Sequence, residues 1–190
     1  DNVTFDIPRG GRVGLVGESG CGKSTLTRAI LGLEPMQAGE IHLDGAPVYA
    51  QGTPNLAVRR KMQVVFQDPY GSFNPRHRVS RLITEPFHLL AAPPPDRVDR
   101  NAEAPTAVCL SPDDAQKYPH RFSGGQRQRL TTARALIIRP QLIVFDATVS
   151  SLDVSVRISI HVLLTCLFRH AHPHSFLRFH ELVVVRALAD

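Results

Sequence analysis

The stretch GESGCGKST at residues 17–25 restricts the fold of this chain more than any other part of its sequence. It matches the pattern G-x-x-x-x-G-K-[ST]. The apolar run RVGLVG at residues 12–17 precedes it and is typical of a short buried strand, whereas the apolar residues within 23–33 recur at helical spacing until Pro35. A glycine-rich turn that joins a strand to a helix in this way predicts a loop that binds phosphate.

Glycines let the backbone of such a loop wrap closely, so that successive N–H groups point at phosphate oxygens beside a helix N-terminus. Lys23 is expected to reach the terminal phosphates, and the hydroxyl of Ser24 is expected to ligate Mg²⁺. At average glycine usage, a chance match in a chain of this length is expected in well under about 1 case in 50. The nucleotide-binding residues predicted on this basis are Gly17, Glu18, Ser19, Gly20, Cys21, Gly22, Lys23, Ser24 and Thr25.

Strand and helix patterns alternate along the chain, which predicts an α/β sheet with helices on both sides. Further strands are expected at residues 39–45, 62–66 and 142–145. The last of these is a continuous apolar run, as in a parallel strand that is covered on both faces. Helices are expected at residues 123–139 and 154–170, and residues 68–119 are expected to form a softer lobe with weak helical stretches.

The composition is that of an ordinary globular protein, with 43% apolar and 21% charged residues. No apolar run approaches the roughly 20 residues that a membrane-spanning helix requires, and residues 1–11 do not show the pattern of a signal peptide. Three widely spaced cysteines argue against a disulfide framework and for a reducing compartment. The net charge of +5 is compatible with nucleic-acid binding, but the basic residues are scattered and do not alternate with aromatic residues, which favours a solvated basic surface.

Two further features suit phosphate chemistry. Asp146 ends the apolar run at residues 142–145, where a carboxylate beside the phosphate loop would hold Mg²⁺ directly or through water. Ser123 and Gln126 have the spacing of a capping box at the start of a helix, and an exposed helix N-terminus is also a site for an anion. A chain with one phosphate loop and a second phosphate-binding helix end predicts a site that two subunits share.

The Ser-Gly-Gly-Gln run at residues 123–126 resembles the signature motif of the ATP-binding cassette family, and the resemblance extends over essentially the whole chain. The segments VVFQDPYGSFNPR at residues 64–76 and YPHRFSGGQRQR at residues 118–129 are similar to the ATPase subunits of peptide (dipeptide, oligopeptide and nickel) importers. The resemblance implies an α/β fold, with a P-loop NTPase core of the RecA-like type and a helical subdomain.

In the domain organisation that the resemblance implies, residues 1–67 and 126–190 form the α/β core. Residues 68–125 form the helical subdomain, which carries the signature motif. Compared with the family, the chain is expected to be truncated at both ends. It begins after the aromatic residue that stacks on adenine, and it stops at Asp190 before the closing strands.

The resemblance also implies a head-to-tail dimer, made of two copies of this chain or of two different subunits, that clamps ATP and Mg²⁺ at its interface. As a peripheral subunit at the cytoplasmic face of the membrane, the dimer would drive membrane permease subunits and indirectly serve a solute-binding protein; no nucleic acid is expected. With Lys23, the catalytic residues would be Gln67, which senses Mg²⁺ and couples the site to the helical lobe, and the switch histidine His180. ATP held by the partner would be contacted by Ser123, Gly124, Gly125, Gln126 and Asp153. The Mg²⁺ ligands would be Ser24, Gln67 and Asp146.

At residue 147 the chain departs from the family that it resembles. Family members carry a glutamate there that positions or deprotonates the attacking water, whereas this chain has Ala147 followed by Thr148. A general base contributes about 10²–10⁴-fold to a rate, or on the order of 3–5 kcal/mol of barrier. ATP binding is therefore expected to be retained while ATP hydrolysis is slowed. Pro105 and Arg178 are further departures, because an interior proline costs a helix about 3 kcal/mol and a buried strand tolerates an unpaired charge poorly.

Two other interpretations stay open at the level of sequence. The basic charge is compatible with a non-transport cassette protein that acts on nucleic acid or the ribosome, although the segment at residues 64–76 argues against it. A degraded gene product without a stable fold is the other interpretation, which the missing edges, Pro105 and Arg178 favour.

Overall fold

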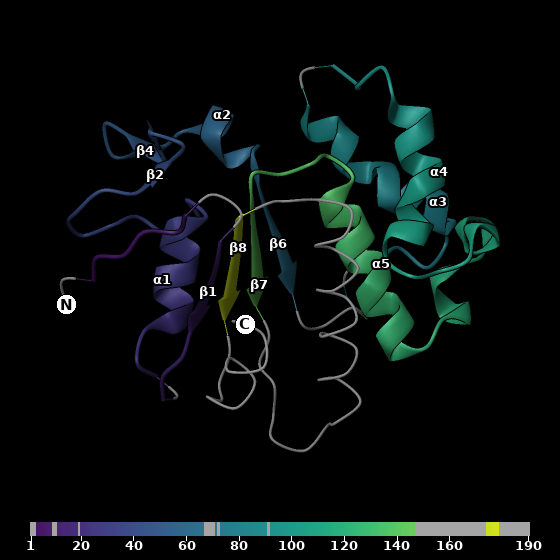
Figure 1. Cartoon of the computed structure of the whole chain (residues 1–190), viewed down its shortest axis with the longest axis horizontal. Coiled ribbons are helices and arrows are strands. Elements are labelled where there is room, and N and C mark those ends of the chain that lie inside the picture. Colours follow the sequence, from purple (N-terminus) through teal and green to yellow (C-terminus); the bar gives the residue numbers. More distant parts are fainter. Residues whose placement is uncertain are drawn as a thin grey trace.

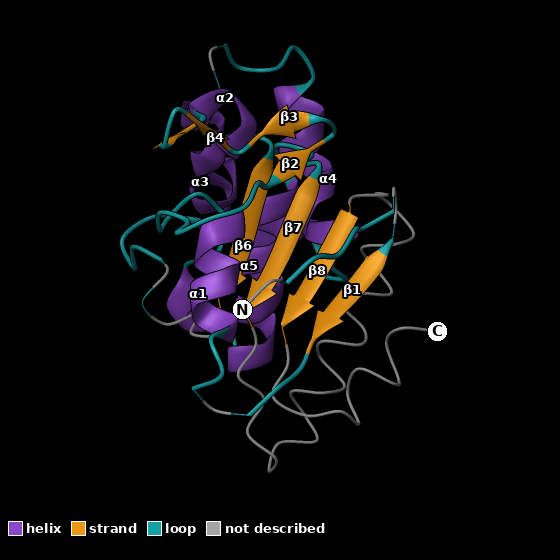
Figure 2. Ribbon diagram, turned by 90° about the vertical axis from the view of Figure 1, so that its left-hand side faces the viewer, coloured by secondary structure: helices purple, strands orange, loops and turns teal. Residues whose placement is uncertain are grey.

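Within the part of the chain that the structure describes, the main sheet has four parallel strands, as expected for an α/β fold. The computed structural model describes residues 3–8, 11–18, 20–66, 71, 73–90, 92–146 and 174–178. The strands are β1 (Arg12–Leu15), β6 (Met62–Phe66), β7 (Leu142–Asp146) and β8 (His174–Arg178). They are ordered β1-β8-β7-β6 and run in the same direction (Figure 2). The strands predicted at residues 62–66 and 142–145 are confirmed.

Helices cover both faces of this sheet. In Figure 1, helix α1 (Lys23–Ile30) lies on one side of the strands and helix α5 (Gly124–Leu136) on the other. Alternate residues of β7 face these two layers: Leu142 and Val144 belong to the hydrophobic cluster that includes Ile30 of α1, while Ile143 is fully buried outside that cluster. The continuous apolar run of β7 is therefore explained by burial on both faces.

The carboxyl ends of the four strands meet in one row. The strand registers place Leu15 of β1 opposite Arg178 of β8, Arg178 opposite Asp146 of β7, and Asp146 opposite Phe66 of β6. Because parallel strands end at a common edge, the loop after β1 and the residue that ends β7 lie on the same side of the molecule. Arg178, which departs from the apolar pattern of its strand, is the register neighbour of Asp146.

Helix α1 ends earlier than its apolar spacing predicts. The expectation of a helix up to residue 33 is wrong, because Gly32 adopts a left-handed φ of 67° and the backbone turns out of the helix there. The N–H of Leu33 donates to the carbonyl of Arg28 and the N–H of Gly32 to that of Ala29, which is a common way for a helix to end at glycine. Leu33 is consequently 50% exposed.

Two short hairpins follow α1. Strands β2 (His42–Leu43) and β3 (Ala46–Pro47) pair with each other, as do β4 (Tyr49–Ala50) and β5 (Thr53–Pro54), before the short helix α2 (Leu56–Arg59). The expectation of a single strand over residues 39–45 is wrong in extent. Asp44 and Gly45 both have positive φ and form the two-residue turn between β2 and β3, so only two residues of that range pair as a strand.

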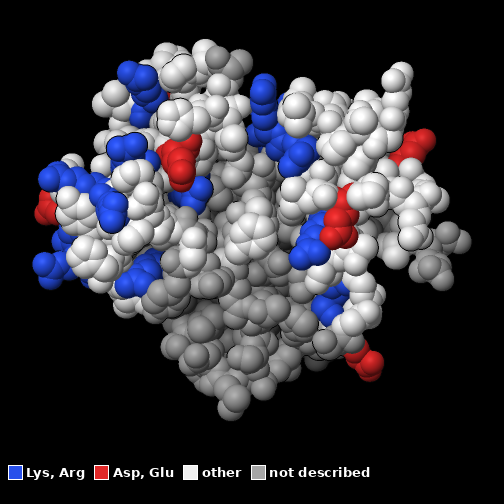
Figure 3. Space-filling view, turned by 180° about the vertical axis from the view of Figure 1, so that it is seen from behind, with Lys and Arg blue, Asp and Glu red and all other residues white. Residues whose placement is uncertain are grey.

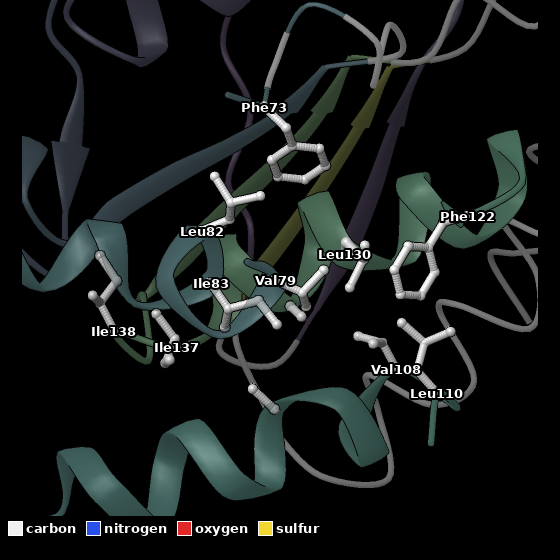
Figure 4. Packing of buried hydrophobic residues seen from close by; sticks show 12 residues of the cluster. Phe73, Val79, Leu82, Ile83, Val108, Leu110, Phe122, Leu130, Ile137 and Ile138 are labelled. Carbon is white, nitrogen blue, oxygen red and sulfur yellow. The ribbon is translucent and has the colours of Figure 1, made fainter. Parts of the chain in front are cut away.

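The remaining described helices form a lobe with its own core. They are α3 (Val79–Thr84), η1 (Glu85–Leu89), α4 (Arg97–Ala107), η2 (Pro112–Gln116), η3 (Pro119–Arg121) and α5. In Figure 4, side chains from residues far apart in the sequence converge in this core. Val79 and Ile83 have no exposed surface, and Leu130 of α5 packs in the same cluster. The lobe therefore has a buried core of its own, and the expectation that it is softer than the rest of the chain stays a prediction.

Pro105 is accommodated within α4 rather than breaking it. It lies two residues before the end of the helix and its side chain is buried. Proline removes the hydrogen bond to the carbonyl four residues earlier, but the helix closes directly afterwards, since the N–H groups of Val108 and Leu110 both donate to the Pro105 carbonyl. The disruption expected from Pro105 is limited to the last turn.

Three other expectations concern cysteines, membrane helices and the C-terminal part. Cys21 is free and exposed, as expected, but Cys109 is disulfide-bonded, contrary to the argument from cysteine spacing. Among the described residues, no helix has the length and apolar character needed to cross a membrane. The helix predicted at residues 154–170 lies outside the described residues.

Candidate nucleotide-binding site

The loop between β1 and α1 requires glycine at two positions because of its backbone conformation. Gly20 and Gly22 have φ values of 84° and 94°, a left-handed conformation that side chains other than glycine rarely adopt. A Cβ at either position would meet no atom within 4 Å, so the backbone conformation rather than lack of space requires glycine. At Gly17 a Cβ would lie 2.7 Å from the sulfur of Cys21, so an alanine there would require the Cys21 side chain to rotate away.

Lys23 places its ammonium group inside this loop. The residue is only 5% exposed, and Nζ donates to the carbonyl oxygens of Gly17 at 2.6 Å and Glu18 at 2.5 Å. It also lies 3.5 Å from the sulfur of Cys21. The loop therefore encloses a positive charge that is hydrogen-bonded to neutral carbonyl groups and carries no carboxylate partner among these contacts. A phosphate oxygen is a stronger acceptor for an ammonium group than a carbonyl.

The first turn of α1 is open to an anion. Gly22 is the N-cap residue and makes no side-chain cap, and the first turn contains no acidic residue. Thr25 is exposed and Ser24 is partly buried beside it. The N–H groups at the start of a helix carry a partial positive charge and attract phosphate. The loop thus offers backbone donors, one ammonium group and a hydroxyl, which is the donor set that a nucleoside triphosphate with Mg²⁺ requires.

The start of α5 forms the capping box that the sequence predicts. The N–H of Gln126 donates to Ser123 Oγ at 3.3 Å, and the N–H of Ser123 donates to Gln126 Oε1 at 3.0 Å. Gly124 and Gly125 form the first helical turn, which contains no acidic residue. Ser123 is exposed and the three residues after it are partly buried, so this helix end is accessible from outside.

The structure brings only some of the predicted site residues together. Gly17, Glu18, Gly20, Cys21, Gly22, Lys23, Ser24 and Thr25 form the loop, and Ser123, Gly124, Gly125 and Gln126 form the separate turn at α5. For Asp146 the structure describes the backbone position at the end of β7 but not the side chain. Ser19, Gln67, Ala147, Asp153 and His180 lie outside the described residues.

One contact of this region was not predicted. The side-chain amide of Gln128 in α5 donates to the backbone carbonyl of Phe66, the last residue of β6, at 3.3 Å. The two residues are 62 positions apart in the sequence. No motif or periodicity indicates this pairing, since it depends on how α5 packs beside β6.

On the face shown in Figure 3, the basic side chains of the described residues do not gather into one patch. Figure 3 shows Lys and Arg spread over both sides of the rear face, with Asp and Glu between them. Several are paired, as Arg28 is with Glu34 and Arg134 is with Glu85, each at 2.8 Å. This distribution supports the solvated basic surface that the sequence predicts.

Comparison with known proteins identifies the family. Residues 1–150 match the ABC transporter family. The oligopeptide transport ATP-binding protein OppF of Bacillus subtilis is 41% identical over 194 residues, which cover 100% of this chain and 64% of that protein. A putative peptide import ATP-binding protein of Brucella ovis is 42% identical over 192 residues, which cover 100% of this chain and 61% of that protein. The chain therefore spans less than two thirds of the length of these relatives.

A solved structure supports the same fold. The structure of cbiO1 from Clostridium perfringens, which is part of the ABC transporter complex cbiONQ, superposes with a TM-score of 0.83. The match covers 99% of this chain and 74% of that chain at 23% sequence identity, so it carries the fold alone. With the phosphate loop, the capped turn at α5 and the match over residues 1–150, these similarities show that the chain belongs to the ABC transporter family.

Proposed function

We propose that this chain is the ATP-binding subunit of an ABC importer for peptides and that its own site hydrolyses ATP poorly. The observation that carries the ATP-binding part is the enclosed ammonium group of Lys23 within a loop whose glycines have left-handed φ. The names of the relatives, which describe oligopeptide transport and peptide import, support the choice of solute class. The length that the chain shares with those relatives covers the region where a nucleotide would bind.

In this proposal the loop residues 17–25 hold the phosphates of ATP, with Lys23 on the terminal ones. Mg²⁺ would be held by Ser24, Gln67 and Asp146, and would neutralise charge on the phosphate oxygens. The common edge of β1, β6 and β7 supports this set, because the loop follows β1, Gln67 follows β6 and Asp146 ends β7. Hydroxyl, amide and carboxylate oxygens are ligands that suit Mg²⁺.

The proposed defect in hydrolysis rests on Ala147, which follows Asp146 directly. A methyl group neither accepts a proton nor orients a water molecule, so the share of the rate that a general base supplies, about 10²–10⁴-fold, is missing. Positioning by Lys23 and electrostatic stabilisation by Mg²⁺ do not depend on residue 147. ATP binding is therefore preserved and turnover is lowered.

The second part of the proposal is a head-to-tail dimer in which each signature turn completes the partner's site. Ser123 to Gln126 would contact the terminal phosphate of ATP held by the partner, with Asp153 at the interface and His180 as the switch histidine. The dimer consists of two copies of this chain or of this chain with an active relative. It acts on permease subunits, as a peripheral protein at the cytoplasmic face of the membrane. The accessible turn at α5, whose first turn contains no acidic residue, supports this arrangement.

The domain organisation proposed for this dimer follows the two hydrophobic clusters. One cluster joins α1 to the sheet, and the other joins α3, α4 and α5. Residues 1–67 and 126–190 would form the core and residues 68–125 the helical subdomain, with α5 at the junction. A lobe that has its own core can change its orientation relative to the sheet without unfolding, as gating by ATP requires.

The proposal is tested by separating binding from turnover. The wild-type chain is expected to bind Mg-ATP in equilibrium titrations while it releases phosphate near background. The variant Ala147→Glu is expected to raise phosphate release by about 10²–10⁴-fold with affinity almost unchanged. Ala147→Gln, which has the same length without the base, is the matched control. Rapid hydrolysis by the wild-type chain alone would refute the defect, and failure to bind ATP would refute the function.

A further inference from the structure

The contact between Gln128 and Phe66 joins two parts of the proposed site. Gln128 lies in the second turn of α5, five residues after the Ser123 cap. Its Nε2 donates to the carbonyl of Phe66, and that carbonyl belongs to the peptide bond that leads into Gln67. The helix that begins with the signature turn is thus hydrogen-bonded to the backbone directly before the residue proposed to sense Mg²⁺.

The carbonyl of Phe66 lies at the end of an edge strand. Within the described sheet, β6 has β7 as its single neighbour, and Phe66 is the register partner of Asp146. Backbone groups on the outer side of an edge strand have no strand partner there and accept side-chain donors. Gln128 therefore donates to the last residue of the edge strand, which is the register neighbour of Asp146.

Helix α5, which carries Gln128, is firmly attached to the helical lobe. Arg127 Nε donates to the carbonyl of Pro119 at 3.0 Å, and Leu130 and Ala133 are buried in the core of the lobe. The hydroxyl of Thr132 bonds back to the carbonyl of Gln128 at 3.1 Å. Gln128 therefore lies in a helix that is joined to the lobe on one side and to the end of β6 on the other.

The side chain of Gln128 contributes little to folding by comparison. It is partly buried, and it is in neither of the two hydrophobic clusters. A neutral hydrogen bond of 3.3 Å in an exposed setting stabilises a fold only weakly. We therefore expect this bond to affect the relative position of α5 and the end of β6 more than the stability of the fold.

We propose that Gln128 is a positioning residue that couples the orientation of the signature helix to the backbone at Gln67, an inference that rests on the proposed function of this site. When the signature turn engages the partner's nucleotide, α5 moves as one body, and the bond to Phe66 carries that movement to the Mg²⁺ end of the chain's own site. The coupling runs through one side-chain amide and one carbonyl, so it is removed by changing a single side chain.

The link itself is tested without nucleotide, by hydrogen–deuterium exchange on the full chain. Gln128→Leu and Gln128→Glu both remove the N–H donor at nearly constant size. Each is expected to speed exchange in peptides covering residues 64–72 by about 3- to 10-fold, the range that one neutral hydrogen bond supports. Gln128→Lys keeps a donor of similar reach and is expected to restore exchange to within about twofold of the wild type.

The functional part is tested by the Mg²⁺ dependence of ATP binding. Affinity for ATP in EDTA is expected to change less than about twofold in Gln128→Leu, because the phosphate loop is untouched. The Mg²⁺ concentration that gives half of the metal-dependent gain in affinity is expected to rise about 3- to 10-fold. Gln116→Leu is the matched control, since Gln116 accepts a bond from Arg78 within the lobe and does not reach the sheet.

Unchanged exchange at residues 64–72 together with an unchanged Mg²⁺ dependence would overturn the inference. So would equal changes in Gln116→Leu, or no rescue by Gln128→Lys, because either result would indicate general loosening of the lobe. If the wild-type chain bound no ATP in EDTA or in Mg²⁺, the proposed function would fail, and the exchange experiment alone would then decide whether the link exists.

Discussion

The two helix ends proposed to contact phosphate are built in opposite ways. At α1, Gly22 offers no side-chain cap, and the loop is organised around the charged side chain of Lys23. At α5, Ser123 and Gln126 satisfy each other's backbone N–H groups with neutral hydrogen bonds. The first end is organised around a charge, whereas the second is organised by its own cap before any ligand arrives.

This difference predicts different roles for the N-termini of α1 and α5. Hydrogen bonds that involve a charged group are about twice as strong as neutral ones, so the loop is expected to supply most of the affinity for ATP. The capped turn presents N–H groups in a fixed geometry, which favours recognition of a phosphate that another subunit already holds. Loss of charge and loss of geometry should therefore have separable effects.

The largest expected effect is on the charged end. Lys23→Met should weaken ATP binding by about 100-fold, because a hydrogen bond from a charged group, here the ammonium group to a phosphate oxygen, contributes about 1.5–3 kcal/mol. The melting temperature without ligand should change by less than about 4 °C, which corresponds to a loss of about 1 kcal/mol in a chain of this size. Lys61→Met, at an exposed lysine, is the control for titration calorimetry and should bind normally. If Lys23→Met bound ATP within threefold of the wild type, the charge at the α1 end would not be the main source of affinity for ATP.

The glycines of the two ends should respond to alanine with opposite signs in stability. Gly22 has a φ of 94°, so Gly22→Ala should destabilise the fold by about 1–2 kcal/mol. Gly125 lies within the helix, where alanine is favoured, so Gly125→Ala should stabilise the chain by up to about 1 kcal/mol. Denaturant unfolding of the ligand-free chains measures both values.

The helical backbone of Gly125 does not require glycine, so its backbone conformation does not explain the residue. Close approach to the partner's nucleotide explains it in the proposed dimer. Gly125→Ala should accordingly weaken dimerisation driven by Mg-ATP in sedimentation experiments while the monomer becomes more stable. A destabilised monomer would indicate that Gly125 serves the fold instead.

Removing the cap at α5 should have a smaller effect. Ser123→Ala leaves the N–H of Gln126 without its acceptor and should cost about 1 kcal/mol of stability, or a melting temperature lower by about 2–4 °C. ATP affinity in the chain's own loop should not change, because Ser123 is not part of it. Ser111→Ala, at the capping box of η2, is the matched control. Weaker binding of ATP to a monomer of Ser123→Ala would contradict the assignment of this turn to the partner's site.

Sequence patterns predicted the parts of this fold that depend on neighbours along the chain. The loop at residues 17–25, the capping box at Ser123 and strands β6 and β7 all follow from local spacing, and each is confirmed in position. The end of α1 was missed because a left-handed Gly32 overrides an apolar spacing that continues to Leu33.

The contacts that were missed depend on packing between distant segments. The hydrogen bond from Gln128 to Phe66 spans 62 positions, and the core around Val79 and Ile83 gathers residues from a stretch that looks weakly helical when taken alone. Apolar residues in short helices give little periodicity, so their burial shows only once α5 is placed against them. The signature motif could be found from sequence, but the residue that ties its helix to the sheet could not.

A third helix end provides the smallest expected effect and a check on the comparison. Asp96 is the N-cap residue of α4, but its carboxylate bonds Arg100 at 2.9 Å and lies 3.4 Å from Arg139 instead of capping its own helix. The hydrogen bond from Arg100 lowers the pKa of Asp96 below its usual value, against the smaller opposing effect of burial. A lowered pKa in the folded state means that the stabilisation is present above the unfolded value of about 3.9 and is lost as the pH falls through the folded one.

Melting curves between pH 6 and pH 2.5 test this end. The wild-type chain should lose slightly more stability over that range than Asp96→Asn, whose amide does not titrate. At pH 6 the variant should already be the less stable of the two, and the gap should narrow as the pH falls through the folded pKa of Asp96. ATP binding should be the same in both chains, because Asp96 pairs with Arg100 of α4 and with Arg139, just after α5, and lies in neither phosphate-binding turn. If Asp96→Asn altered ATP affinity, the helical lobe would be coupled to the phosphate loop through contacts other than that of Gln128.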